Sequence, residues 1–155
     1  MNRRFLDYAI DLGERHMRAG AGGPFGAVIV RDERIIAEGW NQVTSDCDPT
    51  AHAEIVAIRR ACRALASFRL PGASLYCSCE PCPMCLAAIY WARLEAVYFA
   101  AGQEDAAAIG FDDAFIYQEL SKPWSERRLK ASQGPRQQAL RVFAAWCRKS
   151  DRIRY

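Results

Sequence analysis

The sequence predicts an α/β protein, a three-layer α/β/α sandwich around a mixed five-stranded sheet, formed by a single domain over residues 1–155. Helical and strand-like segments alternate along most of the chain, which is typical of layered α/β folds. The 155 residues suffice for one core, and 51% hydrophobic with 25% charged residues is typical of globular proteins. One hairpin and two later strands separated by a helix favour a mixed sheet.

The first half of the chain is predicted to form a helix, a hairpin and a second helix. Apolar residues recur at helical spacing from Phe5 to Met17. Two β-rich stretches then flank a turn at Asp32-Glu33, which is the pattern of a hairpin. After a polar loop, a run rich in Ala and Ile predicts another helix. In order, the expected elements are a helix over 2–18, strands over 25–30 and 35–40, a loop over 41–50 and a helix over 52–66.

The second half is predicted to continue with two strands and further helices. Pro81 and Pro83 permit a helix to begin near them but not to run through them. Gly110 divides residues 106–119 into two short helical pieces. The expected elements are a strand over 74–79, a helix over 83–93, a strand over 95–101, helical pieces within 106–119, an irregular segment over 121–134 with a short strand near Leu129, and a helix over 136–149.

Composition and charge restrict the cellular setting and the partners. No apolar stretch approaches the roughly 20 residues that span a membrane, and the first residues form an amphipathic pattern rather than a secretory signal. We therefore expect a cytoplasmic protein without a membrane partner, whose seven cysteines are reduced thiols. The net charge of +3 is small. Nucleic-acid-binding domains normally carry a larger excess of positive charge. We therefore expect the basic C-terminal residues to form a solvated helix face.

Two short motifs carry the chemistry, His52-Ala53-Glu54 and Pro81-Cys82-Pro83-Met84-Cys85. Cys82 and Cys85 are three residues apart at a predicted helix start, where their sulfurs project to one side and the positive helix end favours thiolates. His52 opens another helix, so the two helix starts can converge. We predict that His52, Cys82 and Cys85 bind one zinc ion per subunit. Three protein ligands leave a position for water, and Glu54 is placed to move its protons.

Three other interpretations of these cysteines remain open. Cys79, Cys82 and Cys85 could begin an iron–sulfur motif, although the Cys-Pro expected next is absent. Cys82 and Cys85 could form a redox pair, which would leave the upstream His-x-Glu unexplained. A structural zinc closed by Cys77 or Cys79 would leave Glu54 without a role.

The motifs resemble those of the cytidine deaminase superfamily over about residues 25–101, and the order of elements agrees with that fold. Residues 80–92 and 107–117, together with the terminal tyrosine, resemble the small bacterial guanine deaminases. That resemblance implies hydrolysis of guanine, a purine base, to xanthine and ammonia. It implies that Glu54 carries a proton from water to the ring nitrogen and that Asp113 serves the departing amine.

The same resemblance implies that the substrate is bound by Phe25, Asn41, Ala53, Trp91, Phe111 and Tyr155. The rings of Phe25 and Trp91 would hold the flat purine, while Asn41 and the backbone N–H of Ala53 would bind its carbonyl and ring-nitrogen edge. Structural roles remain open for several of them. Phe25 could cap the core and Asn41 could serve a turn. Asp112 and Asp113 could cap a helix that begins near Ala114.

The sequence leaves two related activities open and predicts one assembly. A guanosine deaminase and a transfer-RNA adenosine deaminase share the metal motif and remain alternatives. In the guanine deaminases that this chain resembles, the C-terminal segment crosses to a partner subunit and closes the partner's active site. We therefore expect a homodimer in which residues 121–155 are swapped and Tyr155 caps the pocket. The alternative is a helix packed on its own subunit, followed by a frayed end.

Overall fold

A computed structural model of the protein describes residues 1–154 and separates the chain into two compact units, residues 1–114 and 115–155. The first unit holds a sheet and the helices around it. Its elements are α1 (Arg3–Arg18), β1 (Gly26–Arg31), β2 (Arg34–Trp40), α2 (Ala53–Ala64), β3 (Ala73–Cys79), α3 (Pro83–Trp91), β4 (Ala96–Ala101) and α4 (Gln103–Ala108). The second unit consists of α5 (Ala114–Ser121), which begins at the boundary, a 3-10 turn at Trp124–Glu126 and α6 (Arg136–Arg148).

The sheet of the described residues has four strands in the order β2-β1-β3-β4. β1 is antiparallel to both β2 and β3, whereas β3 and β4 are parallel, so the predicted mixed sheet is confirmed. The predicted fifth strand is wrong. Leu129 lies in an irregular segment and is 70% exposed. The surrounding residues lack the alternation of apolar and polar side chains that would bury one face of a strand.

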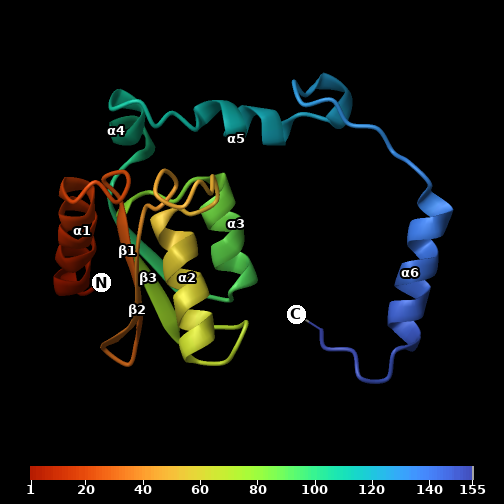
Figure 1. Cartoon of the computed structure of the whole chain (residues 1–155), viewed down its shortest axis with the longest axis horizontal. Helices are drawn as coiled ribbons and strands as arrows, with labels where there is room; N and C mark the ends of the chain where they lie inside the picture. The colour runs from red at the N-terminus through yellow and green to blue at the C-terminus, as the bar shows by residue number, and fades with distance from the viewer. Residues whose placement is uncertain (155) are drawn as a thin grey trace. The chain divides into compact units, whose positions relative to one another are not determined.

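The sheet of the first unit is covered by helices on both faces. α1 lies on one side of it, and α2 and α3 lie on the other (Figure 1). Successive side chains of a strand point to opposite faces, so Val28 packs in the core with Phe5 and Leu12 of α1, while Ile29 packs in the core that contains α2 and α3. Full burial of each such side chain contributes about 1.5–3 kcal/mol.

The second unit has the helices that the sequence predicts but no comparable core. Neither α5 nor α6 contains a buried residue. Phe143 and Trp146 of α6 are 63% and 43% exposed, although their spacing is that of an apolar helix face. Among residues 1–154, no helix combines the length and the hydropathy needed to cross a membrane.

Candidate metal centre and active site

Two helix starts supply the residues of the candidate metal centre. His52 is the N-cap of α2, with φ −67° and ψ 155°, and Cys82 is the N-cap of α3, with φ −63° and ψ 168°. An N-cap residue is extended, so its side chain can turn away from the helix that follows. Glu54 and Cys85 lie in the first turns of the same two helices. The two helix starts converge as predicted, because the side chains of the two N-cap residues, His52 and Cys82, meet.

The residues His52, Cys82 and Cys85 are hereafter called the trio. Their ligand atoms have the spacing that zinc requires. His52 Nδ1 is 3.5 Å from Cys82 Sγ and 3.6 Å from Cys85 Sγ, and the three atoms lie within 4.8 Å of one another. Zinc–sulfur bonds of about 2.3 Å and zinc–nitrogen bonds of about 2.0–2.1 Å place tetrahedral nitrogen and sulfur ligands about 3.5–3.6 Å apart. One nitrogen and two sulfurs, the donor number of catalytic zinc sites, therefore fit this metal.

The protonation of the trio reflects the contacts among its members. A hydrogen bond from Cys85, together with a second one from His52, lowers the pKa of the Cys82 thiol to about 4. The same contact with Cys82, together with burial, raises the pKa of Cys85. The hydrogen bond to Cys82 also raises the pKa of His52. A divalent cation favours thiolates and neutral imidazole, so metal binding would release protons from this group.

Glu54 lies beside the trio and is enclosed by the protein. Its side chain is 7% exposed, and burial raises the pKa of its carboxyl group. The close packing of α2 on β2 depends on Gly39, because a Cβ at that position would lie 2.1 Å from the carbonyl oxygen of Ala53. Ala53, next to Glu54, is itself buried. A carboxyl group with a raised pKa beside a metal site is suited to accept and return a proton.

The Asn41 side chain is held with its oxygen toward the protein backbone. Its Oδ1 accepts hydrogen bonds from the N–H groups of Gly23 and Val43, each at 3.3 Å. The residue is only 6% exposed. Gly22 makes this packing possible, since its φ is +149° and a Cβ there would lie 1.8 Å from the Asn41 carbonyl oxygen. The side-chain amide of Asn41 also carries two N–H donors.

Two predicted aromatic residues gather near Asn41. Phe25 and Phe111 meet edge to face, with ring centroids 4.8 Å apart and an interplanar angle of 88°. A Cβ on Gly23 would lie 3.4 Å from Phe111 and 3.5 Å from both Asn41 and Phe25. Trp91 is placed differently, as the last residue of α3, at the opposite end of that helix from the metal ligands, and is 62% exposed.

A stack of three side chains supports the segment that leads to Asn41. The Trp40 ring lies parallel to the His16 ring at 3.6 Å, and the Arg60 guanidinium lies 4.3 Å from the centroid of Trp40. Arg60 also donates to the carbonyl of Glu38 at 3.0 Å and to the side chain of Gln42 at 3.2 Å. Sequence reasoning missed these residues because they are far apart in the chain and share no motif.

The two neighbouring aspartates before α5 have different partners. Asp112 Oδ1 accepts a hydrogen bond from the backbone N–H of Ala114 at 2.9 Å, which is a capping contact. Asp113 Oδ1 instead accepts from Gln103 Nε2 at 2.8 Å. The charge of Asp113 is one of the groups that raise the pKa of His52. The capping alternative therefore holds for Asp112, whereas Asp113 is directed elsewhere.

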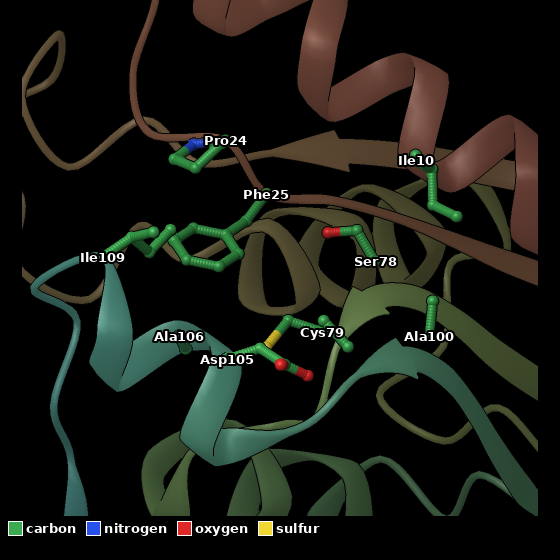
Figure 2. A pocket seen from close by; sticks show the side chains of 10 residues that line it. Ile10, Pro24, Phe25, Ser78, Cys79, Ala100, Asp105, Ala106 and Ile109 are labelled. Carbon is green, nitrogen blue, oxygen red and sulfur yellow. The ribbon is translucent and has the colours of Figure 1, made fainter.

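The remaining cysteines near the site do not join the trio. The Cys77 thiol donates to the carbonyl of Tyr98 at 3.7 Å and the Cys79 thiol to that of Gly102 at 3.6 Å. Cys79 also lines a largely apolar hollow of about 330 Å³ on the α1 and α4 side, where Phe25 and Ile109 lie next to each other (Figure 2). No member of the trio lines this hollow, so it is separate from the metal centre.

Comparison with known proteins places these features in a family. The cytidine and deoxycytidylate deaminase zinc-binding region matches residues 1–101. Guanine deaminase of Bacillus subtilis (strain 168) is 53% identical over 97% of each chain. The crystal structure of guanine deaminase from Bacillus subtilis aligns with a TM-score of 0.97 and 52% identity, covering 100% of this chain and 99% of the other.

A more distant relative carries a different activity. The tRNA-specific adenosine deaminase of Aquifex aeolicus (strain VF5) is 34% identical over 94% of this chain and 93% of its own. The higher identity to guanine deaminase, over nearly the whole length, agrees with the resemblance seen in residues 80–92 and 107–117. The chain therefore belongs to the cytidine and deoxycytidylate deaminase zinc-binding family, and within it to the guanine deaminases.

Proposed function

We propose that this protein hydrolyses guanine to xanthine and ammonia, with one zinc ion bound per subunit. The observation that carries the proposal is the trio at zinc spacing with the buried carboxyl of Glu54 beside it. A bound zinc ion would supply a Lewis acid that lowers the pKa of water toward neutrality. The seven free thiols agree with a cytoplasmic location.

The chain's own residues divide the work of binding and proton transfer. In this proposal the Asn41 amide donates to the purine carbonyl, and the Ala53 N–H meets the same edge. Ala53 is the first residue of α2, and the N-cap side chain makes no hydrogen bond to the free N–H groups of that turn. The rings of Phe25 and Phe111, which meet edge to face, form one wall against the base. The contact of Trp91 with the base stays a prediction, because Trp91 lies at the end of α3 away from the metal ligands.

Two carboxylates suit a reaction that moves two protons to the purine. Glu54 takes a proton from the attacking water and delivers it to the ring nitrogen, for which its raised pKa is an advantage. Asp113 faces the exocyclic amine and assists its departure as ammonia. The separate hydrogen-bond partners of Asp112 and Asp113 support this role for Asp113 alone.

Ammonia release from a panel of substrates tests the proposed specificity. The panel contains guanine, guanosine, adenine, cytosine and an adenosine-containing transfer RNA. We expect the kcat/KM for guanine to exceed that for guanosine by at least about tenfold, because binding of a compact base leaves no room for a sugar. A higher kcat/KM for guanosine would favour the nucleoside activity. Release from the transfer RNA alone would favour the activity of the more distant relatives.

The C-terminal unit is proposed to act in a homodimer. Of 21 basic and 18 acidic residues in the chain, ten basic and three acidic residues lie in 115–155, which leaves eleven and fifteen for residues 1–114. The two units thus carry opposite net charge. Because α5 and α6 contain no buried residue, their apolar side chains need a covering surface. We propose that residues 121–155 of one subunit close the active site of the other, completing one deaminase domain.

Deletion of residues 153–155 tests this arrangement. Tyr155, the proposed cap of the pocket, lies outside the described residues, and Ile153 is 65% exposed. We expect guanine turnover to fall at least about tenfold, because water exclusion and substrate orientation would both suffer. The unfolding temperature should change little. Full activity of the shortened chain would exclude the cap, and a monomeric mass of the full chain by light scattering would exclude the swap.

A further inference from the structure

Asp113 receives its hydrogen bond from a residue to which the sequence motifs assign no role. Gln103 Nε2 donates to Asp113 Oδ1 at 2.8 Å, in a partly buried setting. A hydrogen bond to a carboxylate oxygen fixes the orientation of the carboxylate. Between these residues the chain passes through Gly110, whose φ is +92°. The loop that carries Asp113 therefore has a tertiary contact back to the start of α4.

Gln103 is itself fixed by the segment that leads to the metal ligands. Its backbone N–H donates to Glu80 Oε2 at 3.2 Å. The backbone N–H of Glu80 donates to the carbonyl of Ala101 at 2.9 Å. Glu80 precedes Pro81 and Cys82 directly in the chain. The end of β4 and the start of α4 are thus each joined by one hydrogen bond to Glu80, in the connection between β3 and α3.

These contacts form a continuous path from the metal-binding segment to Asp113. Glu80 holds the backbone of Gln103, and the side chain of Gln103 holds Asp113. The hydrogen bonds of Gln103 to side chains of the described residues go to Glu80 and Asp113, and Asp113 is the one of these two with a proposed part in the reaction.

We propose that Gln103 is a positioning residue that aims the Asp113 carboxylate at the departing amine. The inference rests on the proposed role of Asp113 in deamination. An amide serves this purpose because it donates a hydrogen bond without adding a charge that would compete with the metal or the substrate. The hydrogen bond is formed by the chain's own residues, so the orientation of Asp113 does not depend on a contact with the substrate.

The test replaces the donor while keeping the length of the side chain. Gln103→Met removes the N–H groups, and Gln103→Glu presents a second carboxylate to Asp113. For Gln103→Met we expect kcat for guanine to fall about tenfold with KM within about twofold, since the lost interaction serves the transition state. The Gln103→Glu variant should show a larger fall in kcat, because its new carboxylate repels the carboxylate of Asp113. Glu104→Gln, at an exposed position of the same helix, should match the wild type.

A double-mutant cycle with Asp113→Asn separates this inference from the function on which it rests. If Gln103 acts through Asp113, then Gln103→Met should cause no further loss in the Asp113→Asn background. Additive losses, or normal kinetics of both Gln103 variants beside a severe Asp113→Asn defect, would overturn the positioning role alone. Normal kinetics of Asp113→Asn would overturn the role of Asp113 as well. Zinc content and unfolding temperature show whether a variant has misfolded. If one Gln103 variant misfolds, the kinetics of the other Gln103 variant test the positioning role.

Discussion

Replacement of Glu54 by glutamine is expected to lower guanine turnover by about 10²- to 10⁴-fold, the range that general acid–base groups contribute. An amide has nearly the same shape but cannot take a proton from water. Glu54 is 7% exposed, so bulk solvent cannot easily replace it as the proton carrier. Its burial also raises the pKa of the carboxyl group, which makes the carboxylate a stronger base toward the attacking water.

Steady-state kinetics and metal analysis check this result together. The Glu54→Gln variant should keep its zinc, because the three ligand atoms of the trio come from other residues. Its unfolding temperature should stay within about 4 °C of the wild type, the shift that a change of about 1 kcal/mol in the free energy of unfolding causes in a chain of this length. Glu104→Gln makes the same chemical change at an exposed position and serves as the control. Turnover near the wild-type rate in Glu54→Gln would refute the proton-carrier role.

Replacement of Cys82 by alanine is expected to remove most of the zinc and, with it, nearly all activity. The wild-type chain should hold about one zinc ion, and the variant should retain a small fraction of that. Cys82 is the thiol whose pKa is lowered to about 4, so it offers a thiolate at neutral pH. Its loss leaves one nitrogen and one sulfur, too few to hold the metal tightly. The unfolding temperature should also fall, because zinc stabilises the folded state that binds it.

Atomic absorption measured on purified protein checks the metal content directly. Cys62→Ala is the matched control, since Cys62 lies in α2, is also partly buried and does not belong to the trio. That variant should keep both zinc and activity. Full zinc content in Cys82→Ala would contradict the ligand assignment. Zinc loss in both variants would show that the metal responds to general destabilisation rather than to the removal of a ligand.

Local patterns in the sequence determined most of the secondary structure and the metal site. Helical periodicity and the positions of Pro and Gly predict where the helices begin, and Pro83 is indeed the first residue of α3. The trio could be predicted because each ligand lies at a helix start, where a short motif specifies both the residue types and the local backbone. Interactions within a few residues suffice for such features.

Only the tertiary structure decided which of several equivalent side chains has which partner. Asp112 and Asp113 are identical in type and adjacent, yet one caps α5 and the other meets Gln103, because the backbone directs their side chains differently. The strand expected near Leu129 does not form, since a strand needs an apolar face to bury as well as a local preference, and Leu129 is 70% exposed. Likewise, the stack of Arg60, Trp40 and His16 joins three separate elements. Contacts between distant residues depend on how the whole chain packs, and no local motif records them.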